Sequence, residues 1–222
     1  HWTVPVWFAE MGGFERASNI QYFVRFAEKV LLELGAELTY ITTINEPDSV
    51  IGHGYITLQW PPQKHSYLKA FWVYRNLLVA HKRVYRLAKK MGARRYKVGF
   101  TKAYAWARAG DTRLLTRWAV RLDFLLRDDL IIRYVGQRHL DFIGVNYYFS
   151  DIHKGLRMEG ESLKVNDLGW GMRPTDLKYV LERLSKWGKP LIITESGVAD
   201  REDAYRKWWI SQSLVAISEA MQ

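Results

Sequence analysis

Tyr40-Ile-Thr-Thr-Ile-Asn-Glu-Pro47 is the stretch that decides the fold expected for this chain. Its β-branched and aromatic residues favour a half-buried strand. Pro47 has no backbone N–H to donate to a sheet, so the strand must end at or just before Glu46. The sequence therefore predicts that Asn45 and Glu46 lie at the carboxyl end of a buried strand.

A second stretch, Pro190-Leu-Ile-Ile-Thr-Glu-Ser-Gly197, has the same pattern. Its branched residues lead to Glu195, and Gly197 ends the strand. Barrels built from parallel strands carry their catalytic residues at the carboxyl ends of those strands. Two strand-end carboxylates, Glu46 and Glu195, therefore predict a barrel with its chemistry at that edge.

Helical and extended patterns alternate along the rest of the chain. Apolar residues recur at three- and four-residue spacing in the helical segments, and Gly35 and Gly92 stand where two helices should end. The alternation indicates parallel βαβ units and an α/β fold, with five units if Val4–Phe8 is the end of a strand rather than the loop after it. Strands are expected at 40–46, 96–101, 140–148 and 190–195, helices at 19–35, 67–91, 111–130, 175–187 and 201–221, and long loops at 48–65 and 154–173. Ser18-Asn19 is expected to cap the first of these helices, and Asp111 the third.

The composition describes a globular chain with a basic surface. The 222 residues are 48% hydrophobic and 25% charged, with a net charge of +10. Because the Lys and Arg residues are spread along the helices, a solvated surface is favoured over nucleic-acid binding. No apolar run reaches the roughly 18 residues of a membrane span, so no membrane partner is expected. The absence of cysteine excludes disulfides and fits a cytoplasmic location.

The chain begins at His1, inside an apolar stretch and without an initiator Met, so we expect further sequence to precede it. The other histidines show no metal-ligand spacing, and neither a metal nor a cofactor is expected. These histidines are His53, His65, His81, His139 and His153.

Three motifs occur in the order known from one enzyme family. They are Thr-Ile-Asn-Glu-Pro at 43–47, Asp-Phe-Ile-Gly-Val-Asn-Tyr-Tyr at 141–148 and Ile-Thr-Glu-Ser-Gly at 193–197. Together they closely resemble the family 1 glycoside hydrolases, which include β-glucosidases, β-galactosidases and phospho-β-glycosidases. Shorter matches are His1-Trp2 followed by Pro5, and the dipeptide Gly169-Trp170.

The resemblance implies a TIM (β/α)8 barrel that hydrolyses β-glycosides with retention, through a covalent glycosyl-enzyme. Glu46 matches the family's acid/base and Glu195 its nucleophile. Retention requires these two carboxyl groups to lie about 5–5.5 Å apart, with the acid protonated near neutral pH. The implied substrate-binding positions are His1, Asn45 and Asn146, together with Tyr148 beside the nucleophile and Trp170 on the aglycone side.

The sequence also departs from the family pattern. Ser196 stands where the family normally has Asn after the nucleophile, and Asp48 where it often has Trp or Asn. The resemblance begins at the end of the third strand and stops after the seventh helix. We therefore expect residues 1–222 to form a single barrel domain of about five βα units that lacks the first two strands and the eighth. A complementing chain or self-association would cover its open edges.

The sequence leaves two main functional hypotheses open. The first is a retaining β-glycosidase acting on a small β-glucoside or related β-glycoside. The second is a catalytically impaired barrel fragment that folds by association and binds sugar weakly or not at all. Nucleic-acid binding through the basic surface is a more distant alternative, and it would show as salt-dependent binding.

Overall fold

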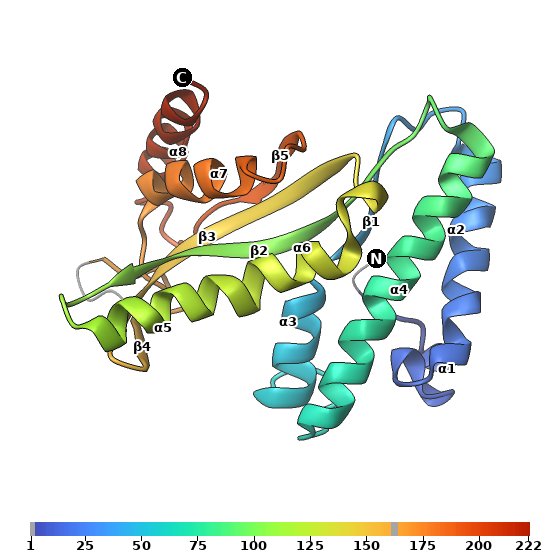
Figure 1. Cartoon of the computed structure of the whole chain (residues 1–222), viewed down its shortest axis with the longest axis horizontal. Coiled ribbons are helices and arrows are strands. Elements are labelled where there is room, and N and C mark those ends of the chain that lie inside the picture. The colour runs from blue at the N-terminus through green and yellow to red at the C-terminus, as the bar shows by residue number, and fades with distance from the viewer. Residues whose placement is uncertain (1–2, 161–163) are drawn as a thin grey trace. The chain divides into compact units, whose positions relative to one another are not determined.

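The computed structural model describes residues 3–160 and 164–222 and divides into two compact units, whose elements Figure 1 labels. Unit 1 comprises His1–Lys102 and Arg133–Gly144, and unit 2 comprises Ala103–Ile132 and Val145–Gln222. The boundary between the units falls within two strands, β2 (Lys97–Ala109) and β3 (Phe142–Lys154), each of which has residues in both units.

In chain order, unit 1 begins with two helices, a strand and two further helices. The hydroxyl of Ser66 accepts a hydrogen bond from the backbone N–H of Lys69 at 3.3 Å, which caps the long helix α4 at its start. The elements are α1 (Val6–Glu10), α2 (Ile20–Leu34), β1 (Tyr40–Asn45), α3 (Pro47–Ile51) and α4 (Tyr67–Gly92), with short helical turns η1 (Gly13–Glu15), η2 (Ala17–Asn19) and η3 (Gly52–Ile56).

Strand β1 pairs in parallel with the first part of β2 (Lys97–Ala109). The register shifts between Thr42 and Asn45, so that Asn45 lies opposite Thr101. A Cβ atom on Gly99 would lie 2.6 Å from the carbonyl oxygen of Phe142, so only glycine permits this close approach of backbones. The parallel βαβ unit predicted from the alternating pattern is thus present.

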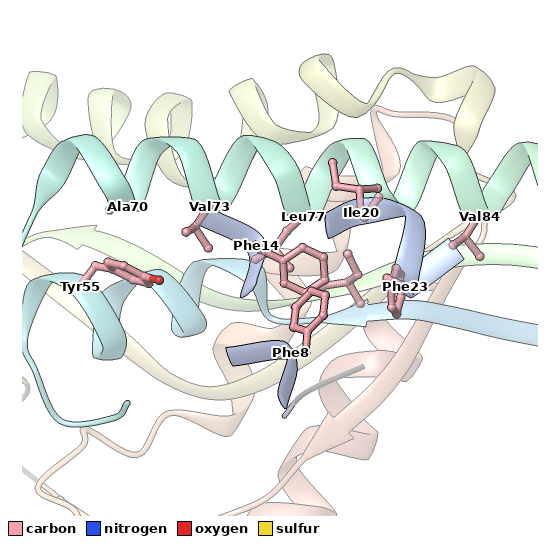
Figure 2. Packing of buried hydrophobic residues seen from close by; sticks show 11 residues of the cluster. Phe8, Phe14, Ile20, Phe23, Tyr55, Ala70, Val73, Leu77 and Val84 are labelled. Atoms are coloured by element: carbon pink, nitrogen blue, oxygen red, sulfur yellow. The ribbon is translucent and has the colours of Figure 1, made fainter. Parts of the chain in front are cut away.

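The core of unit 1 forms where α4 meets aromatic side chains from the first 23 residues (Figure 2). Phe14 is central, with ring centroids of Phe8 and Phe23 at 5.1 and 5.9 Å in edge-to-face contacts. The buried positions of α4 recur at three- and four-residue spacing, as the sequence predicts. The cluster consists of Phe8, Phe14, Ile20, Phe23, Ile44, Tyr55, Ala70, Val73, Leu77, Ala80 and Val84.

Unit 2 contains the later part of β2 and most of β3, with helices between and after them. Its core includes Trp209, which is fully buried and stacks on Tyr147 with a centroid distance of 5.9 Å. The elements are α5 (Leu114–Phe124), the π-helical turn η4 (Leu125–Asp129), β3 (Phe142–Lys154), β4 (Arg157–Gly160), α7 (Leu177–Ser185), β5 (Leu191–Ser196) and α8 (Arg206–Ala220). Helix α6 (Leu130–Val135) is divided between the units.

The strands form a five-stranded sheet in the order β1-β2-β3-β4, with β5 paired to β3. Four of them, β1, β2, β3 and β5, are the strands that the sequence predicts. The fifth, β4, pairs antiparallel with β3 inside the segment 154–173, which we expected to be a loop. Among the described residues no strand precedes β1, because the apolar segment that starts at Val4 turns into helix α1 at Val6. None of the helices in 3–160 and 164–222 combines the length and the hydropathy of a membrane span.

Candidate active site

Glu46 follows β1 directly and begins helix α3. Its side chain is buried, at 8% exposure, and its backbone N–H donates to the carbonyl oxygen of Thr101 at 2.8 Å. Glu46 has φ 42° and ψ 64°, a left-handed conformation that is unfavourable for a residue with a Cβ atom. Pro47 at the first helical position disfavours the right-handed helical region for Glu46, so the regular helix begins only after it. A sharp turn therefore lies at the predicted acid/base.

A buried hydrogen-bond chain holds β1 against α4 next to this turn. His81 is fully buried, and its Nε2 lies 2.9 Å from the carbonyl oxygen of His139, so Nε2 carries the proton. Its Nδ1 therefore accepts from the hydroxyl of Thr43 at 2.7 Å. Burial lowers the pKa of His81 to about 4, so the imidazole is neutral. Thr43 lies two residues before Asn45, which is half-buried at the end of β1.

An ion pair joins the start of α3, just after Glu46, to strand β2. The ammonium group of Lys102 is 3.2 Å from Oδ2 of Asp48, and the Lys102 side chain is only 1% exposed. Asp48 is one of the two residues, with Ser196, at which the sequence departs from the pattern that it resembles. The pairing of Asp48 with Lys102 could not be read from the sequence, because Lys102 stands alone in an apolar strand, where a lysine is normally surface-exposed.

In unit 2, Glu195 lies near the end of β5 and is half-buried. The hydroxyl of Tyr148, on β3, donates a hydrogen bond to Oε2 of Glu195. One residue earlier in β5, the hydroxyl of Thr194 donates to Oδ1 of the fully buried Asn146 at 2.7 Å. One residue later, Ser196 accepts from the indole N–H of Trp209 at 3.0 Å. Three successive residues of β5 are therefore held by side-chain hydrogen bonds.

Trp170 lies beside Tyr148 on a tightly bonded loop. Its ring centroid is 6.3 Å from that of Tyr148 and 5.2 Å from that of Phe149. Oδ1 of Asn166 accepts from the Trp170 N–H, and the Asn166 N–H donates to the Trp170 carbonyl, both at 3.0 Å. The indole is 38% exposed, so a face remains accessible to a ligand.

The structure thus brings Glu195, Asn146, Tyr148 and Trp170 together in unit 2. Glu46 and Asn45 are adjacent in unit 1, and His1 lies outside the described residues. Sequence reasoning missed Lys102, Thr194, Phe149 and Trp209. Thr194 and Phe149 stand next to predicted residues, but Trp209 is one of ten tryptophans and carries no local signal. Within 3–160 and 164–222 no group of three or more His, Cys, Asp or Glu side chains could hold a metal ion.

A family model for glycosyl hydrolase family 1 matches residues 1–121, more than half of the chain. The chain belongs to glycosyl hydrolase family 1. The match includes Glu46 and the Asp48–Lys102 pair, and it ends before the strand that carries Glu195. The resemblance read from the three motifs is thereby confirmed.

Curated relatives of this family 1 chain span all of it. A β-galactosidase of Sulfolobus acidocaldarius is 25% identical over 100% of this chain and 54% of its own length. A chloroplastic galactolipid galactosyltransferase, SFR2 of Arabidopsis thaliana, is 26% identical over 100% of this chain and 38% of its own length. The chain therefore spans about half or less of the length of these relatives.

Solved structures agree with the fold. A β-glycosidase from Pyrococcus horikoshii is 30% identical, with a TM-score of 0.88 over 98% of this chain and 56% of that one. A β-glucosidase from Thermotoga maritima in complex with glucoimidazole, at 19% identity, has a TM-score of 0.90 and supports the fold alone. The predicted fold class is confirmed: this family 1 chain is an α/β protein that carries part of a TIM barrel, with a sheet of five strands.

Proposed function

We propose that this chain belongs to a retaining β-glycosidase in which Glu195 is the nucleophile and Glu46 the acid/base. The contact between the Tyr148 hydroxyl and Oε2 of Glu195, at the end of a strand in a family 1 chain, carries the proposal. A carboxylate that accepts a hydrogen bond from one side keeps a defined orientation. Its other oxygen, Oε1, is then the atom that attacks.

In the first step, an oxygen of Glu195 attacks the anomeric carbon and forms an ester, while Glu46 donates its proton to the leaving glycosidic oxygen. In the second step, Glu46 removes a proton from water as that water attacks the same carbon, and the Glu195 carboxylate is released. Two inversions give net retention. This chemistry requires the two carboxyl groups to lie about 5–5.5 Å apart, and a separation beyond about 9 Å in a ligand-bound crystal structure would contradict it.

The remaining predicted residues have roles in substrate binding. We assign Asn45 and Asn146, with amide groups that donate and accept hydrogen bonds, to sugar hydroxyls. Trp170 offers an aromatic face to the apolar side of a sugar ring or to the aglycone. His1 is assigned to the sugar on the resemblance alone.

We also propose that residues 1–222 form one barrel domain without its first two strands and its eighth, so that a complementing segment or self-association completes it. An apolar pocket of ≈ 470 Å³ in unit 1 supports this, because Trp7 and Phe26 line it and remain 50% and 61% exposed. The alternative function, an impaired fragment that binds sugar weakly or not at all, rests on the same observation. Apolar surface of this kind normally marks an interface.

Covalent labelling tests the proposed function. A 2-deoxy-2-fluoro-β-glucosyl fluoride forms the glycosyl-enzyme but slows its breakdown, so the intact mass should increase by one sugar. Peptide mapping should place the label on Glu195. The matched control is Glu182→Gln, which removes an exposed carboxylate from α7 of the same unit and should leave labelling unchanged. Labelling of any other residue, or none in a sample that hydrolyses aryl β-glucosides, would contradict the assignment.

The galactosyltransferase relative raises a second outcome for the same intermediate. A sugar hydroxyl in place of water would attack the ester of Glu195 and produce a transglycosylation product, with the same two carboxylates in the same roles. Product analysis with an aryl β-galactoside, in the presence and absence of added galactose, separates the two outcomes. A larger share of disaccharide with added galactose would identify transfer.

A further inference from the structure

The turn that joins β1 to α3 is attached to β2 at two successive residues. On one side of Pro47, the Glu46 N–H donates to the carbonyl oxygen of Thr101 at 2.8 Å. On the other side, Oδ2 of Asp48 is 3.2 Å from the ammonium group of Lys102. The backbone contact and the side-chain contact therefore hold the same turn from adjacent positions of one strand.

This turn needs support because its backbone is unfavourable. Glu46 has a left-handed conformation, with φ 42°, and such conformations persist in non-glycine residues only where the surrounding structure imposes them. Helix α3 has five residues, too few to be stable without tertiary contacts. The orientation of the Glu46 side chain consequently depends on what fixes α3 against β2.

Lys102 is unusual in being almost completely buried. Its side chain is 1% exposed, whereas that of Asp48 is 30% exposed. A buried ammonium group requires a counter-charge, because transfer of an unpaired ion from water into protein is costly. Oδ1 of Asp48 is buried and has no hydrogen-bond partner among the described residues, so the contact of Oδ2 with Lys102 is what anchors this carboxylate.

We propose that Lys102 and Asp48 are positioning residues for Glu46, and this inference rests on the acid/base role proposed above. The ion pair fixes the first turn of α3 to β2 and so sets the direction in which Glu46 presents its carboxyl group. It also places a neutralised pair of charges next to that group, since the Cα atoms of Glu46 and Asp48 are at most about 7 Å apart along the chain.

The other buried titratable groups on elements packed against this turn are uncharged. Burial lowers the pKa of His81, on α4, to about 4, and burial together with Glu15 raises the pKa of Tyr55, on η3, well above its ordinary value. His53 on η3 is half-buried and bonds to Thr57 at 3.3 Å. Asp48 on α3 and Lys102 on β2 are therefore the charged pair nearest to the Glu46 backbone contact.

The test measures the pKa of the Glu46 carboxyl group by ¹³C NMR in the full chain labelled at glutamate carboxyl carbons, with the signal assigned by its loss in Glu46→Gln. In Lys102→Met the Asp48 carboxylate, without the ammonium group, should raise that pKa by about one unit, and in Asp48→Asn the Lys102 ammonium group, without that carboxylate, should lower it by a similar amount. The double variant should return close to the wild type. Opposite shifts are a signature that general loosening of the turn does not produce.

Two further variants keep the test decisive. Lys102→Arg retains the charge and should preserve the pKa of Glu46. Lys89→Met removes an ammonium that lies 2.6 Å from Asp141 elsewhere in unit 1, and it should also leave that pKa unchanged. If Lys102→Met does not fold, the direction of the Asp48→Asn shift decides alone. Equal pKa values in the wild type and Asp48→Asn, or shifts of the same sign in both neutral variants, would overturn the proposal.

Turnover separates this inference from the proposed function. In an active sample, Asp48→Asn and Lys102→Met should reduce kcat about tenfold or more for an aryl glycoside with a poor leaving group, which needs a well-placed acid. The glycosylation of a dinitrophenyl glycoside, which needs little protonation, should be preserved. A wild-type chain with no turnover would count against the proposed function, while the NMR shifts would still decide whether the pair controls Glu46.

Discussion

The hydroxyl of Tyr148, on β3, donates a hydrogen bond to Oε2 of Glu195, on β5. A second side-chain hydrogen bond between the same strands lies next to it. In β3, the fully buried Asn146 is two residues before Tyr148, and it accepts from Thr194, the residue before Glu195. The two strands are thus joined by two side-chain hydrogen bonds at the point where the proposed nucleophile lies. This arrangement makes the orientation of one carboxylate oxygen depend on one phenol.

Tyr148→Phe removes that phenol without changing the ring. A hydrogen bond to a charged group contributes about 1.5–3 kcal/mol, so kcat should fall by about 10- to 100-fold in an active sample. Thermal unfolding should change little, because the ring packing with Trp170 is retained. The control is Tyr205→Phe, which alters a partly exposed phenol of the same unit. Equal activity of Tyr148→Phe and the wild type would contradict the proposed role.

The two glutamates should respond differently to azide. Glu46→Gln should still form the glycosyl-enzyme from an aryl glycoside with a very good leaving group, and then stall for want of a base. Azide needs no base, so it should restore turnover and give a β-glycosyl azide. Glu195→Ala should give the α-azide instead, because azide then occupies the place of the nucleophile. The anomeric configuration, measured by NMR, would show the roles to be reversed if each variant gave the other product.

His81 should make the stability of unit 1 depend on pH. Its pKa is lowered to about 4 in the folded state, against about 6.5 in an unfolded chain. Above pH 6.5 both states are neutral and the effect is absent. Between pH 6.5 and 4 the unfolded state binds the proton first, so the free energy of unfolding falls, by up to about 3 kcal/mol in total.

Urea unfolding at pH 7.5, 5.5 and 4.5 measures this dependence. His81→Gln loses hydrogen bonds at every pH, but it should lose less additional stability on acidification than the wild type does. His53→Gln, a substitution at a half-buried position of the same unit, should keep the wild-type slope. An identical slope in His81→Gln would contradict the buried neutral imidazole.

Neutralising Arg108 should destabilise the protein more than neutralising Asp176, its partner in an ion pair. Asp176 is fully buried and accepts from Nε of Arg108 and from the hydroxyl of Ser150, both at 2.8 Å, whereas the Arg108 side chain is 35% exposed. Arg108→Met leaves a buried carboxylate without its counter-charge and should cost about 3 kcal/mol. Asp176→Asn should cost less, because Arg108 can turn toward water. Denaturant unfolding measures both, with Lys178→Met, from an exposed ion pair, as the control.

Two residues that were expected to cap helices lie near the helix starts but bond to other groups. Asn19 was expected to cap α2 with its side chain, yet its amide donates instead to the carbonyl oxygens of Met11 and Gly13, at 3.1 and 2.9 Å. Asp111 was expected to cap the helix at 111–130, but it accepts from the N–H of Arg113, after which α5 begins. Asparagine and aspartate serve turns as well as caps, so the sequence alone does not distinguish the two uses.

The sequence by itself determined the strands that carry the proposed chemistry. Residues 40–46 and 190–195 are β-branched runs ended by proline or glycine, a purely local signal that does not depend on the rest of the chain. The motifs are local signals too, so their order along the chain was sufficient to predict the family and to single out Glu46 and Glu195. The helix of residues 67–91 was equally predictable, because its apolar periodicity is long and continuous.

Only the tertiary structure decided which distant side chains meet at these strand ends. Lys102 pairs with Asp48, His81 joins Thr43 to the backbone of His139, and Trp209 bonds to Ser196. The bonded residues are 13 to 58 positions apart in the sequence, and which of them meet depends on how the helices pack against the strands. A lysine, a histidine and a tryptophan have many stable environments, and the packing of the whole unit selects one.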